Sequence, residues 1–159
     1  MANVDNSQDI LDSRDVIERI EELEAEKSAL EDALSEAQEA LREYEPPAEG
    51  EELATLQDAI DTAQAEVVAW AESDDARELK VLQALAEEGE GSPDWTDGET
   101  LIRDSYFQDY AEQLADDIGA IDRNANWPCN CIDWERAASE LQNDYSSVDF
   151  DGVEYWIRS

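Results

Sequence analysis

The sequence predicts a mainly helical α+β protein, in which a long antiparallel helical hairpin precedes a small domain of two helices and a β-hairpin. Three observations lead to this class. Apolar residues recur every three or four positions over roughly the first 90 residues, which is the period of a helical seam. A short break with two prolines separates the two longest seams. The last residues of the chain flank an Asp-Gly pair, a favoured hairpin turn.

The first predicted helix covers residues 13–45. Ser13 or Asp12 can cap its start, because a short polar side chain there accepts a hydrogen bond from the first turn. The seam alternates spacings of four and three over roughly four heptads, which is typical of a coiled coil. It consists of Val16, Ile20, Leu23, Lys27, Leu30, Leu34, Ala37 and Leu41. Lys27 is its polar member, and a polar residue at such a position fixes the register at some cost in stability.

A second helix is predicted to start near Glu51, after Pro46, Pro47 and Gly50 have ended the first. Its seam repeats the same spacing and consists of Leu53, Leu56, Ile60, Ala63, Val67 and Trp70. The short break between the helices predicts an antiparallel hairpin. At 1.5 Å per residue the helices are about 48 Å and about 30 Å long, which leaves part of the longer seam uncovered. A third helix or a second copy of the chain should cover it, so a homodimer is one expectation.

The third helix is predicted over residues 74–88, with Leu79, Leu82 and Leu85 on one side and a stop at Gly89. The loop at residues 88–95 is the expected boundary between two domains, 1–90 and 91–159.

The C-terminal domain is expected to hold two helices and a hairpin. One helix is predicted over residues 100–118 and ends at Gly119, and another follows from an N-cap at Asp133. Strands at 148–150 and 153–157 flank the turn. A lone hairpin is marginal in water, so its apolar face must pack on these helices.

The charge of the chain excludes several classes of function. Lys and Arg total 10 against 44 Asp and Glu, which gives a formal net charge of −34, and there is no His. The absence of His removes Ser-His-Asp triads and nearly all His-based metal sites. Direct binding to nucleic acid is disfavoured, because cations that neutralise phosphates are scarce. The segment MANVDNSQ has no signal-peptide pattern and no apolar run could span a membrane, so we expect a cytosolic protein.

No residue set points to catalysis, a cofactor or a metal. Cys129 and Cys131 supply two thiolates, fewer than a tetrahedral zinc site needs within one chain. Asp149, Asp151 and Gly152 lie in a turn that lacks the spacing of a calcium loop. We therefore expect a protein that is not an enzyme and that binds no cofactor or metal.

The acidic faces of the helices carry the functional prediction. Asp32, Glu36, Glu39 and Glu43 follow one face at spacings of four, three and four. Neighbours at this spacing lie about 5–6 Å apart, and each like-charge pair costs a few tenths of a kcal/mol. Solubility does not require this repulsion, so the carboxylates are expected to meet a cationic partner. The predicted binding residues are Asp32, Glu36, Glu39, Glu43, Asp58, Asp61, Asp116 and Asp117.

The density of charge suggests which cationic partner. Residues 15–45 hold 12 acidic and 3 basic side chains. This is one net charge per ~5 Å of helix, about a third of the charge density of duplex DNA. The second and third helices, packed alongside the first, would form an acidic rod whose charge density is closer to that of DNA. An acidic rod of this kind can occupy a DNA-binding groove lined with Lys and Arg. The sequence therefore predicts a nucleic-acid mimic.

The C-terminal third resembles a known family. The segments YFQDYAEQLADDIGAI (106–121), IDWERAASELQNDY (132–145) and VDFDGVEYW (148–156) are similar to the C-terminal part of the ArdA antirestriction family. The matching residues are mostly structural: Tyr110, Ala111, Leu114, Gly119, Asp133, Trp134, Ala138, Leu141 and Tyr145. The resemblance implies a protein of a phage or mobile element that imitates DNA and blocks a restriction–modification enzyme. Residues 1–90 do not resemble that family.

We therefore expect a DNA-mimic inhibitor of a bacterial defence system, acting on a restriction–modification enzyme or a CRISPR effector complex. Two alternatives stay open. The chain could be an acidic coiled-coil interaction protein that binds through Ile20, Leu23, Leu30 and Leu34, or it could sequester a basic nucleoid protein.

Overall fold

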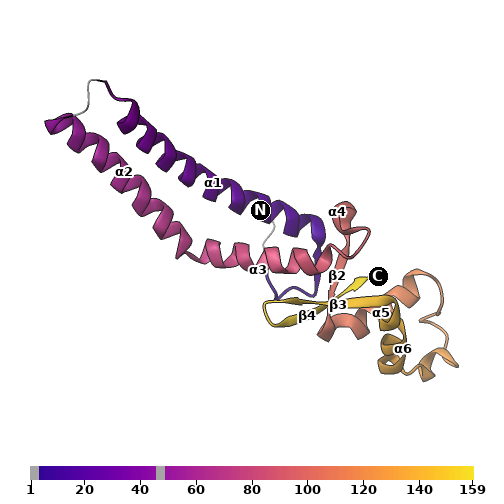
Figure 1. Cartoon of the computed structure of the whole chain (residues 1–159). Coiled ribbons are helices and arrows are strands. Elements are labelled where there is room, and N and C mark those ends of the chain that lie inside the picture. Colours follow the sequence, from indigo (N-terminus) through magenta and orange to yellow (C-terminus); the bar gives the residue numbers. More distant parts are fainter. Residues whose placement is uncertain (1–3, 46–48) are drawn as a thin grey trace. The chain divides into compact units, whose positions relative to one another are not determined.

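The structure, a computed structural model, describes residues 4–45 and 49–159 and is mainly helical with one small antiparallel sheet (Figure 1). The predicted helix stop at Pro46 and Pro47 and the first three residues of the chain lie outside the described ranges. The longer helices are α1 (Ser13–Glu43), α2 (Gly50–Ala71), α3 (Asp74–Gly89), α5 (Phe107–Asp117) and α6 (Trp134–Leu141). The shorter helical elements are α4 (Trp95–Gly98), η1 (Asp104–Tyr106), η2 (Cys129–Cys131) and η3 (Gln142–Asp144). The strands are β1 (Ile10–Asp12), β2 (Thr100–Arg103), β3 (Tyr145–Phe150) and β4 (Val153–Arg158).

The C-terminal hairpin forms around the predicted turn, although its first strand begins at Tyr145, three residues before the predicted start. Strands β3 and β4 pair antiparallel, and Phe150 opposite Val153 closes a two-residue loop. Asp151 and Gly152 both have positive φ, 49° and 79°. This is the type I′ turn that an Asp-Gly pair favours, because its twist matches that of the strands.

The sheet is larger than the predicted hairpin. In the described residues it has four strands in the order β1-β2-β4-β3, all antiparallel. The prediction of a helix from residue 100 is wrong over its first turn, since Thr100–Arg103 form β2 and the helix α5 begins only at Phe107. Leu101 and Ile102 are fully buried in this strand. Burial on both sides of a central strand outweighs the weak helical pattern of these few residues.

An aromatic core joins the sheet to α5 and α6. Phe107 is 1% exposed and belongs to a buried cluster with Ile102, Ala111 and Ala138. The ring of Tyr145 meets Phe107 edge-on, with 5.2 Å between the ring centroids. The predicted packing of the hairpin on the two C-terminal helices is thus present, because residues of α5, α6 and β3 meet in one cluster.

The helical elements of the N-terminal half follow their predicted bounds. α1 begins at Ser13, α2 at Gly50, and α3 ends at Gly89. Figure 1 shows α2 running back beside α1, and residues of both helices line a common pocket. The described side chains that follow the predicted seams are buried or half-buried, apart from Lys27: Ile20, Leu23, Leu30, Leu34, Ala37 and Leu41 on α1, and Leu53, Leu56, Ile60, Ala63, Val67 and Trp70 on α2.

Internal contacts divide the chain into two compact units. The first unit comprises Met1–Arg19 together with Val81–Ser159, and the second comprises Ile20–Lys80. This division differs from the expected domains 1–90 and 91–159, because β1 pairs with β2 and so brings the start of the chain into the sheet. The boundaries between the units fall within α1 and α3.

Among the described residues, no helix combines the length and the apolar character that a membrane-crossing segment requires.

Candidate protein-binding surface

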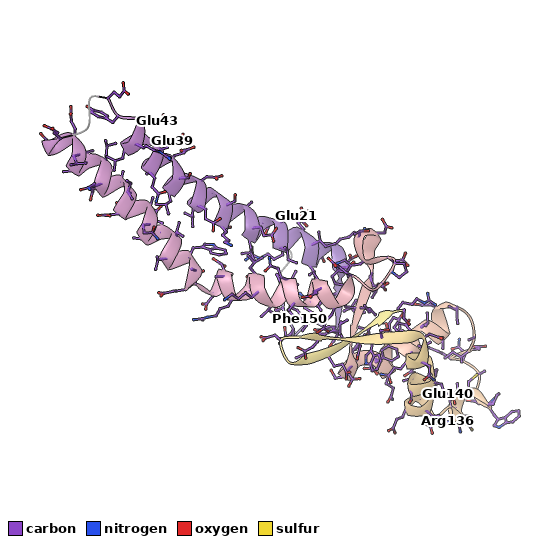
Figure 2. The ribbon with its side chains drawn as sticks, in the orientation of Figure 1. Glu21, Glu39, Glu43, Arg136, Glu140 and Phe150 are labelled. Carbon is purple, nitrogen blue, oxygen red and sulfur yellow. The ribbon has the colours of Figure 1, made fainter. Side chains whose placement is uncertain are left out.

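The four predicted carboxylates of α1 form a row on the exposed side of the helix. Asp32, Glu36, Glu39 and Glu43 are all exposed. Each follows a seam residue by two positions, which in an α-helix is a rotation of about 200°. The row therefore lies on the side of α1 opposite the seam. Figure 2 shows Glu21, Glu39 and Glu43 along the side of α1 that faces away from α2. We call Asp32, Glu36, Glu39 and Glu43 the α1 row.

The predicted carboxylates of α2 lie on a different face. Asp58 and Asp61 are exposed. Asp58 follows the seam residue Leu56 by two positions and so lies opposite the α2 seam, whereas Asp61 follows Ile60 directly and lies on its flank. Leu30 of α1 and Val67 and Trp70 of α2 line one pocket, so the sides of the two helices opposite these residues point away from each other. The structure thus does not bring these six carboxylates together on one face.

Asp116 and Asp117 belong to the other unit and lie in the last turn of α5. Both are exposed, and the Oδ2 atom of Asp116 lies 3.0 Å from the Nε atom of Arg123 in an ion pair. Carboxylates at a helix C-terminus are unfavourable, because that end carries a partial negative charge. No basic residue stands in this last turn to offset them.

The charge of the second unit approaches that of a nucleic-acid duplex. Residues 20–80 hold 20 acidic and 4 basic side chains, a net charge of −16. Its part of α1, residues 20–43, is about 36 Å long at 1.5 Å per residue. The part of the unit made by α1 and α2, residues 20–71, holds 16 acidic and 2 basic side chains. One net charge therefore falls on about 2.6 Å of this length, against ~1.7 Å for duplex DNA. A surface of this kind attracts cations and repels anions strongly.

Few cations interrupt this surface. The Nζ atom of Lys27 lies 3.7 Å from the Oε1 atom of Glu31, one turn further along α1. Arg77 and Asp74 pair at 2.6 Å near the start of α3. Both pairs are exposed, and exposed pairs of this type contribute little to stability.

Sequence reasoning missed two features of the surface. Glu51 is exposed on α2 and precedes Asp58 by seven positions, so it lies on the same face; a search at heptad spacing would have found it. Ile118 and Trp127 are 69% and 80% exposed. Trp127 stands between asparagine and proline outside any periodic pattern, and this isolation was the available signal.

The buried polar groups of the first unit have structural partners. Glu99 is 7% exposed, and its carboxylate accepts hydrogen bonds from the Ser92 hydroxyl at 2.7 Å and from the Thr100 amide at 3.0 Å. Burial and a hydrogen bond with the Tyr110 hydroxyl raise the pKa of Tyr145 well above its usual value. These hydrogen bonds help to hold the fold together.

In the described part of the chain, no group of three or more side chains of the metal-binding types is arranged to hold an ion. Cys129 is half-buried and Cys131 is exposed, and both are free thiols.

Comparisons of this chain with protein-family models, with characterised proteins and with solved structures gave no match.

Proposed function

We propose that this protein is a non-enzymatic DNA mimic of a phage or mobile element that acts in the cytoplasm of a bacterial host. Its acidic helical surface occupies the DNA-binding groove of a defence complex, either a restriction–modification enzyme or a CRISPR effector. The observation that carries the proposal is the α1 row, four exposed carboxylates opposite the apolar seam, in a unit whose net charge is −16. A groove lined with Lys and Arg for phosphates would accept such a row.

The scaffold of the mimic is an antiparallel coiled-coil hairpin of α1 and α2. The seams that follow the heptad spacing are buried or half-buried on both helices. Knobs-into-holes packing of such seams keeps the two helices rigid against each other. A rigid scaffold matters because ordering flexible side chains and segments on binding costs affinity.

The two-faced arrangement of carboxylates fits the shape of a duplex. The α1 row and the α2 face with Glu51 and Asp58 lie on opposite sides of the helix pair. Two helices of about 10–12 Å each set these sides apart. A duplex likewise presents two phosphate backbones, and a groove that grips both would contact both faces of the hairpin.

The resemblance to the ArdA family adds a preference for an antirestriction role. Its residues fall in α5, α6 and the β3–β4 hairpin, and several of them belong to the aromatic core. Asp133 caps α6 by accepting a hydrogen bond from the Arg136 amide at 3.1 Å. The residues similar to the ArdA family thus stabilise the fold of the first unit. The carboxylates of the second unit that are proposed to bind the partner lie outside the similar segments.

A second candidate is an interaction protein that binds through its seam. Leu30, Leu34 and Leu41 are only half-buried in the single chain. A second copy or a helical partner could cover what remains exposed, since burial of apolar area is favourable. In that case the carboxylates of the α1 row would be dispensable.

The test uses purified complexes and a matched pair of variants. A labelled duplex is bound to a type I restriction–modification enzyme or to a CRISPR effector complex, and its displacement by this protein is followed by fluorescence anisotropy. One variant carries Asp32→Asn, Glu36→Gln, Glu39→Gln and Glu43→Gln. The control neutralises four exposed carboxylates of the first unit, by Glu87→Gln, Asp94→Asn, Asp97→Asn and Asp109→Asn.

We expect the wild-type chain to displace the duplex from one of these complexes. The α1-row variant should need about tenfold more protein, because charge pairs across the interface are lost. The control, with an equal change in net charge, should lose much less. No displacement from either complex, or equal losses in the two variants, would contradict the proposal.

A further inference from the structure

The connection between α5 and α6 presents apolar side chains in a defined geometry. Gly119 has φ of 70°, its amide donates to the Asp116 carbonyl at 3.0 Å, and the Ala120 amide donates to the Ala115 carbonyl at 2.9 Å. These two bonds form a Schellman motif, which fixes the end of the helix. Ile118 stands inside this motif and is nevertheless 69% exposed. Its exposure is therefore set by the hydrogen-bonded helix end.

Trp127 is the more exposed of the two, at 80%. It too lies next to local hydrogen bonds, since the Asn130 amide donates to the Asn126 carbonyl at 2.8 Å and the Cys131 amide donates to the Pro128 carbonyl at 2.9 Å. An indole buries 150–250 Å² when it is covered. Leaving it in water forgoes the favourable free energy of burying that apolar area. Among the described residues, these two are the most exposed large apolar side chains.

We propose that Trp127, with Ile118, is an anchor that contacts an arginine-lined surface of the protein partner. This inference rests on the proposed function and assigns the first unit its own contact with the partner. The argument for the occupant is charge complementarity. Asp116, Asp117 and Asp122 lie close to Ile118 in the sequence and are exposed. Asp116 pairs with Arg123, which is the one basic residue between Ile118 and Trp127, so Asp117 and Asp122 carry the local argument. The first unit, with 24 acidic and 6 basic side chains, has a net charge of −18.

Arginine suits this surface better than lysine. A guanidinium group stacks flat on an indole and pairs with carboxylates in two hydrogen bonds, whereas an ammonium group is a compact, strongly hydrated point charge. Trp is also the best aromatic acceptor for a cation. Aromatic anchors surrounded by polar contacts are typical of the residues that dominate binding energy at protein interfaces. An anchor of this type gives the mimic a contact that DNA itself does not offer.

The first experiment measures the affinity of the full chain for an oligoarginine peptide and an oligolysine peptide of equal length, by fluorescence anisotropy of the labelled peptides. Carboxylates themselves pair better with guanidinium than with ammonium. The indole is therefore reported by the change that Trp127→Ala causes in the ratio of the two dissociation constants. We expect Trp127→Ala to weaken binding of oligoarginine by about two- to fivefold and that of oligolysine by less. Trp127→Phe should retain part of the preference. Val68→Ala, which truncates an exposed apolar residue of α2, is the control and should change neither affinity.

A local readout accompanies the affinities. The indole ¹H–¹⁵N signal of Trp127, assigned by its absence in Trp127→Ala, should shift on addition of oligoarginine at lower peptide concentration than with oligolysine. An unchanged signal, together with an unchanged ratio of affinities in Trp127→Ala, would overturn the inference.

The second experiment separates this inference from the proposed function. Trp127→Ala and the α1-row variant are compared in the duplex-displacement assay. If the α1-row variant loses inhibition and Trp127→Ala does not, the anchor is refuted and the mimic stands. If the wild-type chain displaces no duplex but Trp127→Ala still loses the arginine preference, the proposed target is refuted and the arginine-binding surface stands.

Discussion

At the scale of single residues, Ser13 lies at the predicted start of α1, but its hydroxyl bonds to residues that are distant in the sequence. Sequence reasoning placed Ser13 or Asp12 at the start of α1 as a cap. Asp12 takes that role, since its Oδ1 atom accepts a hydrogen bond from the Arg14 amide at 2.9 Å. Ser13 is fully buried, and its hydroxyl donates to the Trp95 carbonyl and accepts from the Glu99 amide, both at 2.7 Å. These partners lie more than 80 residues away, so no local pattern could reveal them.

Ser13→Ala should therefore destabilise the first unit. Removal of the hydroxyl leaves the Glu99 amide and the Trp95 carbonyl with one partner fewer in a buried place, which costs about 1–3 kcal/mol. The measurement is the free energy of unfolding in urea. Ser28→Ala, an exposed position of α1, should change it by less than about 0.5 kcal/mol. Equal, small effects of both substitutions would show that the buried network contributes nothing to stability.

The raised pKa of Tyr145 predicts a loss of stability at alkaline pH. Burial, followed by the hydrogen bond with Tyr110, holds the Tyr145 hydroxyl protonated in the folded chain above its usual pKa of 10.0. In the unfolded chain it ionises near that usual value. The folded state thus binds more protons once the pH exceeds about 10, and its free energy of unfolding falls as the pH rises further.

The measurement is urea unfolding at pH of about 8 and about 11. Tyr145→Phe should show a smaller fall in stability between the two values than the wild-type chain, because it lacks the ionising hydroxyl. Tyr155, whose pKa is also raised by burial, accounts for part of the fall that remains. An identical fall in wild type and Tyr145→Phe would contradict the assignment.

At the scale of elements, the sequence was informative where a period extends over many residues. The seams of α1 and α2 repeat over several heptads, and the burial of their residues follows that pattern closely. The β3–β4 hairpin was also predictable, because its turn residues carry a strong local preference. Strands β1 and β2 were not, since they have only three and four residues. Their pairing joins Leu11 to Leu101 across the chain, and no local period records it.

The candidate surface shows the same limit. The exposure of all eight predicted carboxylates follows from helical periodicity and the position of the seams. Their grouping does not, because it depends on which faces α1 and α2 turn toward each other. The structure sorts Asp32 and Glu36 onto one side, Asp58 onto another, and Asp116 into a different unit. Trp127 lay outside the prediction for a related reason, since exposure of an apolar residue is a property of the folded loop.

At the scale of the whole molecule, charge is the dominant property. Each compact unit carries a large negative charge, −18 in the first and −16 in the second. Self-repulsion on this scale lowers the stability of a folded chain. The carboxylates at the end of α5 and in the α1 row lower the stability of their helices further, through the helix dipole and through repulsion between like charges. A cationic partner removes both costs at once, which is the reason to interpret the charge as a binding surface.

The salt dependence of binding tests this account most directly. The affinity of the full chain for the complex from which it displaces duplex DNA, as proposed, is to be measured from about 50 mM to about 500 mM monovalent salt, a range over which the screening length falls severalfold. We expect the affinity to drop by on the order of 100-fold or more, with a shallower dependence for the α1-row variant. An affinity that stays constant over this range would contradict the claim that these carboxylates take the place of phosphates.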